Sequence, residues 1–360
     1  MEKTRVAIIG CGGIANGKHM PSLKKTGLCE MVAFCDIIKE RAVKAAAEYG
    51  VAGSKVYTDY KKLLKDPSIE VVHVCTPNRM HSKITVDALN AGKHVMCEKP
   101  MAINYKEALK MVEAAKTNGK LLTIGYQQRN RADSRYLKAE CEKGTLGDIY
   151  FAKALSVRRR GVPTWGVFLN EYEQGGGALI DIGTHALDLT LWLLNDYDVN
   201  YVVGTSYHKL NHDTDTANLW GDWDPKQFTA DDATFGFVVM KSGATIMLEA
   251  SWALNTLVTS EATCQLCGTK AGADMLDGLR INGVKNNRQY VEKPDFSVGA
   301  VAFFEGDSNA SPADLEAMIW LKAVRGEGEL LVKPEQAATV TRVLDAIYES
   351  SKSGKPVYFK

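Results

Sequence analysis

The sequence predicts two domains: an α/β domain with a doubly wound, parallel sheet, followed by an α+β domain built on a large, mostly antiparallel open sheet. Over the first ~120 residues, short apolar runs alternate with helical segments, which is typical of βαβ units. Later strand candidates are joined by hairpin turns such as Lys241-Ser242-Gly243. The length of 360 residues also favours two domains. We place them at 1–124 and 125–360, and we expect the C-terminal helices to pack back towards the first domain.

The elements of the first domain follow from apolar runs and helix stop signals. Apolar runs that end near glycine, proline or aspartate predict the strands, and glycines at 50, 92 and 119 mark helix ends. The expected strands are 5–9, 31–35, 56–57, 71–75, 94–97 and 121–125. The expected helices are 14–25, 39–49, 60–65, 83–90 and 105–118.

In the second domain the strand candidates become longer and alternate in polarity. The expected strands are 149–157, 201–205, 234–240, 244–251 and 261–266. The expected helices are 135–143, 177–194, 312–324 and 334–351. Between them, residues 206–232 are rich in Asp, Trp, Thr and Asn and predict a long loop. Its aromatic residues suit a lid over a large substrate, and a plain surface excursion fits equally well.

Composition excludes several classes of partner. The chain has 44 basic and 43 acidic residues, a net charge of +1, so no basic excess points to nucleic acid or an anionic membrane. The apolar run 6–9 is too short for a signal peptide, and no run approaches the ~20 residues of a membrane span. The eight cysteines are scattered in apolar runs, which suits reduced thiols. We expect a cytoplasmic protein.

A glycine cluster follows the first strand. Gly10-Cys11-Gly12-Gly13-Ile14-Ala15 matches G-x-G-x-x-A between a strand and a helix, where Gly10 allows a tight turn and Gly12 leaves room for a pyrophosphate. Asp36 ends the second strand, about 20 residues further on, where a carboxylate binds ribose hydroxyls and repels a 2′-phosphate. The alternative is an ordinary glycine turn. The pattern favours dinucleotide binding, with NAD preferred over NADP, and Lys39 is the residue that would blunt this preference.

Two further groups of residues suggest catalysis. Glu98-Lys99-Pro100 follows a strand, at the edge of a parallel sheet that faces ligands, although a solvated surface lysine is the simpler interpretation of Lys99. Asp181 and His185 lie one turn apart on an otherwise apolar helix that follows Gly175-Gly176-Gly177. A carboxylate beside an imidazole tunes a general base. The pair could also brace the helix structurally, and a metal site is a weaker third option.

Together these motifs resemble the Gfo/Idh/MocA oxidoreductases, and the resemblance runs nearly end to end. Gly125-Tyr126-Gln127-Gln128-Arg129 resembles that family's strand opening the second domain. Gly268-Thr269-Lys270-Ala271-Gly272 resembles a turn of its large sheet, and 346–357 its terminal helix and tail. The resemblance implies an N-terminal Rossmann domain and an NAD(P)-dependent oxidoreductase that acts on CH–OH groups of sugars, inositols or glycosides.

The resemblance also implies roles for particular residues. Lys99, Asp181 and His185 form the catalytic set: the lysine hydrogen-bonds the reacting oxygen, the histidine takes its proton, and the aspartate binds substrate or orients the histidine. Which of Lys99 and His185 holds the proton stays open. Residues expected to line the cofactor are Gly10, Gly12, Gly13, Ile14, Asp36, Thr76, Asn78, His81, Glu98, Lys99, Gln127 and Trp165. Residues expected to bind substrate are Lys99, Arg158, Arg160, Trp165, Asp181 and His185.

Around the substrate, Arg158-Arg159-Arg160 and Pro163-Thr164-Trp165-Gly166 suit a sugar, because guanidinium groups bind hydroxyls and Trp covers a sugar ring. A charged strand end is the alternative. This stretch resembles members that form 3-keto glycosides. We expect no metal, because Cys264 and Cys267 would point to opposite faces of a strand. We also expect a homo-oligomer formed through the C-terminal sheet.

The favoured function is oxidation of a glucoside at C3 with NAD, and inositol dehydrogenase is the next alternative. A glycosidase that works by transient oxidation and a non-catalytic NAD-bound sugar sensor are alternatives from other classes. Retention of both Lys99 and His185 argues against the sensor, since a sensor needs neither group.

Overall fold

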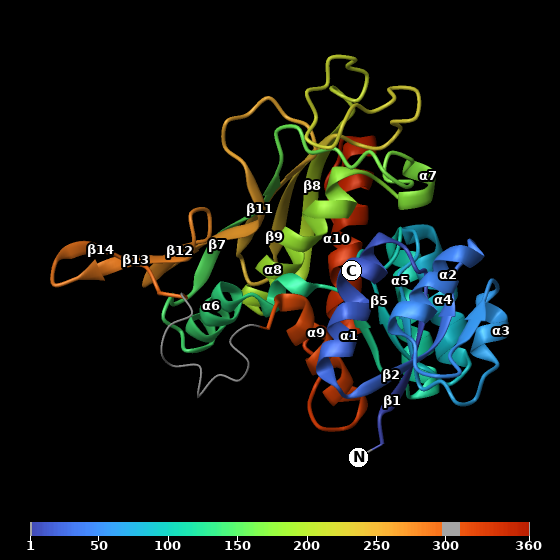
Figure 1. The fold of residues 1–360 in the computed structure, drawn as a ribbon. Coiled ribbons are helices and arrows are strands. Elements are labelled where there is room, and N and C mark those ends of the chain that lie inside the picture. The colour runs from blue at the N-terminus through green and yellow to red at the C-terminus, as the bar shows by residue number, and fades with distance from the viewer. Residues whose placement is uncertain (1, 297–309, 360) are drawn as a thin grey trace. The chain divides into compact units, whose positions relative to one another are not determined.

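The computed structural model describes residues 2–296 and 310–359, which form two compact units (Figure 1). Unit 1 comprises residues 1–130 and 309–338, and unit 2 comprises 131–308 and 339–360. The predicted boundary at 124/125 stays a prediction. By its contacts the chain divides after Asn130, and a C-terminal segment joins unit 1.

Unit 1 is built on a six-stranded parallel sheet in the order β3-β2-β1-β4-β5-β6. Except for the edge strand β3, which is exposed or half-buried, its strands are largely buried apolar runs, as expected for a parallel sheet covered on both faces. Their bounds are β1 (Thr4–Ile9), β2 (Cys29–Cys35), β3 (Lys55–Tyr57), β4 (Val71–Val74), β5 (His94–Cys97) and β6 (Leu122–Ile124). The strand order reverses between β1 and β4, which is where such sheets bind ligands.

The helices of unit 1 largely follow the sequence-based expectation. They are α1 (Met20–Thr26), α2 (Lys39–Tyr49), α3 (Tyr60–Leu64), α4 (Asn78–Asn90) and α5 (Tyr105–Asn118). Asn104 caps the start of α5, and Gly119 in the left-handed conformation ends it. One expectation is wrong: α4 begins at Asn78 and not at 83, because Pro77 in an extended conformation starts the helix directly.

Two segments differ from the expected regular elements. The expected helix 14–25 opens with a π-helical turn, η1 (Ala15–His19), before α1. Residues 125–129 form no strand: after β6 the chain enters a 3₁₀ helix, η2 (Gln127–Asn130), within unit 1.

Helix α9 (Pro312–Val324) belongs to unit 1, although it comes late in the sequence. A capping box of Ser311 and Asp314 starts it. Its buried Trp320 and Leu321 join the apolar core formed with β1 and α1. Part of the first unit's core therefore comes from the C-terminal region.

Unit 2 is built on a nine-stranded sheet in the order β14-β13-β12-β11-β7-β10-β9-β8-β15, in which only the β10–β7 pair is parallel. The bounds are β7 (Ile149–Val157), β8 (Val199–Tyr207), β9 (Ala233–Met240), β10 (Thr245–Ser251), β11 (Ser260–Gly268), β12 (Ala271–Asp274), β13 (Arg280–Lys285), β14 (Arg288–Glu292) and β15 (Val357–Tyr358). The predicted hairpin at 241–243 and the turn at 268–272 are present.

Helical segments pack on one face of this sheet. They are η3 (Leu179–Gly183), α8 (Thr184–Leu194) and the unit 2 part of α10 (Pro334–Ser353), while α6 (Ala132–Glu142) packs against α8; α7 (Glu171–Gln174) precedes η3 in the chain. Helix α8 packs against β7 and β11, and Ile347 of α10 lies so close to β8 and β9 that a Cβ at Gly204 or Gly236 would approach it within 2.7 Å. Within the described residues, one helical stretch, Glu171–Leu194, is long and apolar enough to cross a membrane, and 89% of its apolar window is buried in the protein.

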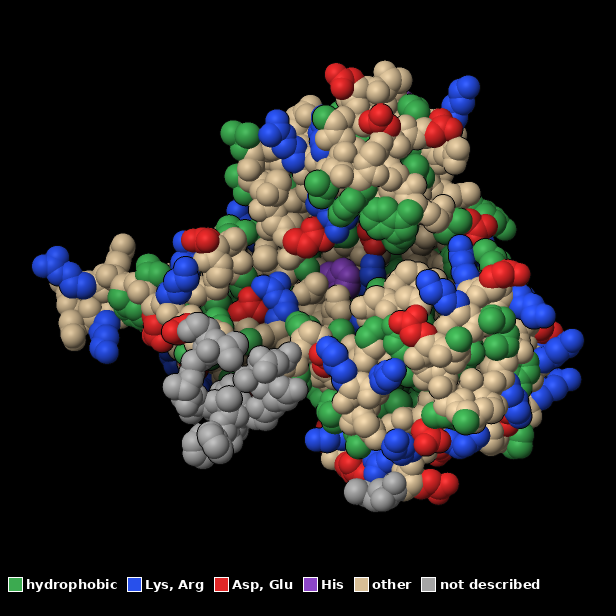
Figure 2. Space-filling model, viewed as in Figure 1, with side chains coloured by type: hydrophobic (Ala, Val, Ile, Leu, Met, Phe, Trp, Pro, Cys, Tyr) green, Lys and Arg blue, Asp and Glu red, His purple; other side chains and the backbone are tan. Residues whose placement is uncertain are grey.

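The surface is mixed in charge. In the face shown in Figure 2, acidic and basic side chains lie among one another on both units. This agrees with the near-zero net charge of the sequence.

Candidate active site

The glycine turn of unit 1 has the geometry of a phosphate-binding turn. Gly10 has φ +91°, and a Cβ there would lie 2.4 Å from the Cys75 carbonyl oxygen, so only glycine fits. A Cβ at Gly12 or Gly13 would meet no atom within 4 Å, so the outer side of the turn is open. Ile14 is 43% exposed at the start of the helix. This open turn before a helix N-terminus fits a dinucleotide pyrophosphate.

Asp36 lies against the same turn. Its Oδ2 accepts a hydrogen bond from the Cys11 backbone N–H at 2.9 Å, and its Oδ1 accepts from Ile38 N–H at 2.9 Å. The structure therefore places the expected carboxylate beside the glycines, where a ribose would meet it. Its role in discriminating NAD from NADP stays a prediction.

The segment after β4 is tied to the loop that carries Lys99. Thr76 follows the strand and Asn78 begins α4. The ring of His81 is buried, with Nδ1 2.7 Å from the Pro100 carbonyl oxygen and Nε2 2.8 Å from that of Thr76. Burial lowers the pKa of His81. His81 thus lies between two loops at the ligand edge of the sheet, and its neutral ring can donate to only one of the two carbonyl oxygens.

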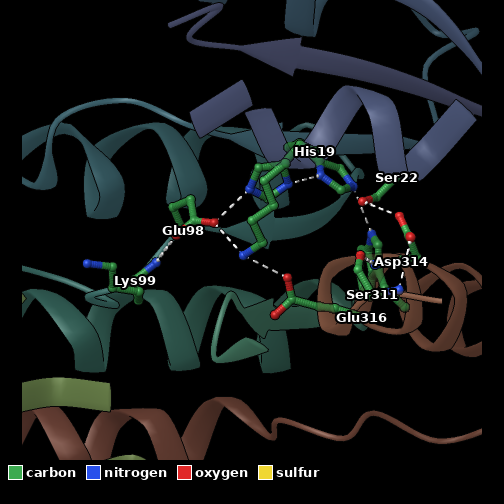
Figure 3. Close-up of polar contacts among 10 residues, drawn as sticks. His19, Ser22, Glu98, Lys99, Ser311, Asp314 and Glu316 are labelled. Carbon is green, nitrogen blue, oxygen red and sulfur yellow. Dashed lines mark hydrogen bonds and ion pairs between the residues drawn. The ribbon is translucent and has the colours of Figure 1, made fainter. Parts of the chain in front are cut away.

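Lys99 and Glu98 differ in environment. Lys99 is half-buried, and its side chain extends away from the Glu98 carboxylate (Figure 3). Glu98 is 4% exposed, and its Oε2 accepts the Lys99 backbone N–H at 3.0 Å. The prediction that Glu98 touches the cofactor stays a prediction, as does that for half-buried Gln127 in η2.

In unit 2 a close approach starts the helix that carries Asp181 and His185. A Cβ at Gly177 would lie 2.0 Å from the Asp231 carbonyl oxygen, which explains this glycine. The Asp231 carboxylate accepts hydrogen bonds from the N–H groups of Gly177 and Leu179, at 2.5 and 3.1 Å, and from the Tyr348 hydroxyl at 2.7 Å. A carboxylate distant in sequence thus caps this helix.

Asp181 and His185 lie on successive turns, as expected, but the first turn is π-helical. Such turns occur often at functional sites. Asp181 is 8% exposed, and its Oδ2 accepts the Trp252 Nε1–H at 3.0 Å. His185 is half-buried. Asp188, which follows His185 on the same helix, is fully buried.

The arginine and tryptophan segment packs against the long loop. Trp165 is 51% exposed and meets Trp220 edge-to-face at 5.1 Å between ring centroids. Arg158 lies 5.2 Å from the centre of the Trp220 ring and is ion-paired with Glu261. Burial by itself lowers the pKa of Arg158, but the ion pair with Glu261 outweighs this effect and raises the pKa. Arg160 donates to the Asn255 side-chain oxygen at 2.8 Å.

The loop 206–232 has a core of its own. Trp223 and Phe228 are buried and pack with Trp252, whose indole N–H binds Asp181. Sequence reasoning did not select Trp252 or Asp231, because their partners lie far away in the chain. The pair of adjacent acids at 231–232, directly before an apolar strand, is the one local signal for Asp231.

The candidate residues are divided between the units. The glycine turn, Asp36, Thr76, Asn78, His81, Glu98, Lys99 and Gln127 belong to unit 1, whereas Arg158, Arg160, Trp165, Asp181 and His185 belong to unit 2. Among the described residues, no group of three or more His, Cys, Asp or Glu side chains is arranged to hold a metal ion.

A doubly wound sheet with an open glycine turn, an adjacent carboxylate and a lysine after β5 defines an NAD-binding oxidoreductase. Residues 4–126 match the family model described as "Oxidoreductase family, NAD-binding Rossmann fold", and 138–359 match the model of its C-terminal alpha/beta domain. The chain belongs to the Gfo/Idh/MocA family. The predicted family, fold class, oxidoreductase activity on CH–OH groups and NAD cofactor are thereby confirmed.

In addition to these family models, the chain is similar to individual proteins. The chain is 35% identical over 353 residues to D-glucoside 3-dehydrogenase of Escherichia coli K12, covering 98% of this chain and 97% of the relative. It is 32% identical to inositol 2-dehydrogenase of Salmonella typhimurium, over 53% of this chain and 55% of the relative. The fold matches levoglucosan dehydrogenase in complex with NADH and levoglucosan, with a TM-score of 0.83, 21% identity and 99% coverage of both chains.

Proposed function

We propose that this protein is an NAD-dependent dehydrogenase that oxidises the C3 hydroxyl of a glucoside. The observation that carries the substrate class is the similarity to D-glucoside 3-dehydrogenase, which extends over 98% of the chain. The similarity to inositol 2-dehydrogenase covers only 53% of it. The similarity over nearly the whole chain therefore supports a glucoside over an inositol.

The proposed chemistry uses one group from unit 1 and two from unit 2. Lys99 hydrogen-bonds the reacting oxygen and stabilises its developing negative charge. His185 accepts the hydroxyl proton, and Asp181, which Trp252 holds in place, binds the substrate or orients His185. Bound NAD supplies the hydride acceptor at its nicotinamide ring. The open glycine turn and Asp36 are the residues that would hold it.

Exposed aromatic rings supply the proposed sugar-binding surface. Trp165 and Trp220 are 51% and 40% exposed, and they meet edge-to-face beside Arg158. A sugar presents apolar C–H faces and polar edges, so a half-exposed indole next to a cation suits it. The contact of Trp220 with Trp165 makes part of the loop 206–232 a member of this proposed surface.

A panel of glucosides, free sugars and inositols, assayed by NADH absorbance with product regiochemistry by NMR, tests the proposal. We expect NADH to accumulate together with an intact 3-keto glucoside. Oxidation of inositols in preference to glucosides would support the alternative substrate class. Release of free aglycone without net NADH would instead show a glycosidase, and NAD binding without turnover on any member would indicate a sensor.

We further propose that the protein forms a homo-oligomer through the face of the unit 2 sheet opposite its helices. Val203, Phe237 and Met247 are paired across β8, β9 and β10 and are 37–41% exposed. An exposed apolar row of this kind favours a protein contact. Light scattering should give a multiple of the chain mass for the wild type and a smaller assembly for Phe237→Lys, whereas a monomeric wild type would refute the oligomer.

A cytoplasmic location is also proposed. It rests on the eight cysteines, each of which is free in the structure. Burial raises the pKa of the Cys11 and Cys35 thiols to about 12, so these thiols stay protonated and unreactive. Cell fractionation with thiol labelling should find reduced protein in the cytoplasmic fraction, and oxidised protein in another compartment would contradict the proposal.

A further inference from the structure

A group of polar side chains lies buried within unit 1, next to the backbone of Lys99 (Figure 3). We refer to it as the Glu98 network. It consists of Lys18, His19, His73, Glu98, Glu316 and Trp320, each at most 8% exposed. These residues come from η1, β4, the end of β5 and α9, and none has a role in the chemistry proposed above. So many buried polar groups are costly unless each is paired.

The positions of the protons in this network follow from one donor. Trp320 Nε1 can only donate, and it lies 3.2 Å from His73 Nε2, so that nitrogen carries no proton. The proton of the neutral His73 ring is then on Nδ1, 2.9 Å from His19 Nδ1, which accepts it. His19 therefore carries its proton on Nε2 and donates it to Glu98 Oε1 at 2.7 Å. Burial also keeps the pKa of His73 well below its usual value.

Both oxygens of Glu98 are used. Oε1 accepts from His19 and from the Lys18 ammonium, each at 2.7 Å, and Oε2 accepts the Lys99 backbone N–H at 3.0 Å. Burial would raise the pKa of Glu98, but Lys18 and His19 hold it well below its usual range. A Cβ at Gly125 would lie 3.0 Å from Oε1, so the absence of a side chain there makes room for the carboxylate. Glu98 is thus an ionised, fixed acceptor that orients the peptide of Lys99.

Lys18 is shared between two carboxylates. Its ammonium lies 2.7 Å from Glu98 Oε1 and 2.8 Å from Glu316 Oε2. Lys18 belongs to η1, which begins directly after the glycine turn, and Glu316 belongs to α9. The ion pairs therefore connect the start of the glycine-turn helix, the residue before Lys99 and a helix from the C-terminal region.

We propose that Lys18 and Glu316 are positioning residues of the dehydrogenase: they fix Glu98, and through it the backbone of Lys99, relative to the glycine turn. The inference rests on the proposed function, because it takes Lys99 as the group that contacts the reacting oxygen. Neither residue is expected to touch substrate. Their loss should lower turnover, since small displacements of a reacting group reduce rates strongly.

The test compares Lys18→Met and Glu316→Gln with a control on the same helix, Asp314→Asn. Asp314 accepts from Ser22 at 2.7 Å and from Lys25 at 3.0 Å, so it joins α9 to α1 without contacting the Glu98 network. For each variant, kcat and KM for the glycoside, the Kd for NADH and the thermal midpoint are measured. We expect Lys18→Met to lower kcat on the order of 100-fold and Glu316→Gln about tenfold, with KM changing less than threefold.

The control separates positioning from stability. Asp314→Asn should lower the thermal midpoint but keep kcat within about twofold of the wild type. If the two network variants lose stability in the same way yet retain kcat, the inference is wrong. Glu316→Gln keeps an oxygen that accepts from Lys18, so it preserves the test if Lys18→Met does not fold. A wild type inactive on every hydroxyl substrate would refute the proposed function instead, and this outcome is visible before any variant is made.

Discussion

The two units hold their candidate catalytic groups by different physical means. In unit 1, buried charges of opposite sign fix the peptide of Lys99: Lys18 lies between Glu98 and Glu316. In unit 2, Asp181 is held by the neutral indole of Trp252, and backbone N–H groups of its helix are held by Asp231. Removing one partner of a buried ion pair typically costs about 3–5 kcal/mol, whereas an unsatisfied neutral hydrogen bond costs about 1–3 kcal/mol.

This difference indicates how strongly each unit depends on single side chains. The charged arrangement fixes Lys99 firmly but depends on every member, because one missing charge leaves another buried without a partner. In unit 2 the carboxylates of Asp181 and Asp231 are bound by neutral N–H donors, so the support is spread over several weaker bonds. Each unit has a π-helical turn directly after a glycine-rich stretch, η1 in unit 1 and η3 in unit 2. The two units therefore share this local structure but differ in the side chains that hold it in place.

The largest expected effect is on Lys99 itself. Lys99→Ala should lower kcat roughly 1000-fold, because the reacting oxygen loses its charged donor, while NADH still binds. Steady-state kinetics and NADH fluorescence titration measure the two quantities. Lys83→Ala, an exposed lysine of α4, is the control and should behave as wild type. Normal turnover in Lys99→Ala would remove this residue from the mechanism.

Substitution of two adjacent acids tests how the helix that carries Asp181 is held in unit 2. Asp231→Asn should lower kcat about 30-fold, because it weakens the bonds that place the helix carrying Asp181. The neighbouring Asp232 accepts from Leu210 and Asn211 at 2.6 and 3.0 Å and so holds the long loop. Asp232→Asn should therefore act mainly on KM. Equal effects of both variants on kcat would contradict the assignment of Asp231 as the group that places the helix carrying Asp181.

The preference for NAD over NADP tests the role of Asp36, which lies against the glycine turn. Asp36→Ala should weaken NAD binding about tenfold and relax the discrimination against NADP, because the carboxylate that would repel a 2′-phosphate is lost. The ratio of kcat/KM for the two cofactors measures this effect. The exposed acid Glu40 of α2 supplies the control Glu40→Ala. An unchanged ratio in Asp36→Ala would refute the ribose assignment.

A smaller effect is expected at the aromatic surface of unit 2. Trp220→Ala should raise KM for the glycoside about fivefold while kcat stays within about twofold, since the ring binds the substrate without touching the reacting atoms. Its neighbour Leu219 is 73% exposed, and Leu219→Ala is the control. A loss in kcat without a change in KM would place Trp220 in the chemistry and not in binding.

The smallest expected effect is a pH dependence of stability at α9. Burial works against ionisation of Asp314, but its hydrogen bonds from Ser22 and Lys25 lower its pKa from the usual 3.8 to about 2. A group whose pKa is lower in the folded state stabilises the fold above its unfolded pKa and loses this effect as the pH falls. Urea unfolding should thus show Asp314→Asn less stable than wild type at pH 7, with the difference shrinking between about pH 4 and pH 2. A difference independent of pH would contradict the assignment.

Local patterns in the sequence predicted the parallel sheet and the glycine turn well, because strand, turn and helix are neighbours there. Asp36 was found because its distance from the turn is set by a single βαβ unit. The parts that escaped prediction depend on distant contacts. Lys18 and Glu316 carry no signal beyond a charge on a helix, and their pairing exists only once α9 joins unit 1.

Other differences have local physical causes. Strands β13 and β14 are short and exposed along most of their length, so they lack the apolar alternation by which strands are recognised. The π-helical turns η1 and η3 have the composition of ordinary helices, and only the packing around them reveals the wider turn. The predicted sharing of one substrate by Lys99 and His185 rests on the family resemblance.

The placement of α9 has a consequence for the order of folding during synthesis. The segment 1–130 leaves the ribosome long before residues 309–338 exist, yet unit 1 needs both. Until α9 is made, Lys18 lacks Glu316, His73 lacks Trp320, and the apolar core around Met20 and Phe34 stays uncovered. The nucleotide-binding half of this chain is therefore begun first and completed late, after most of the second unit has been translated.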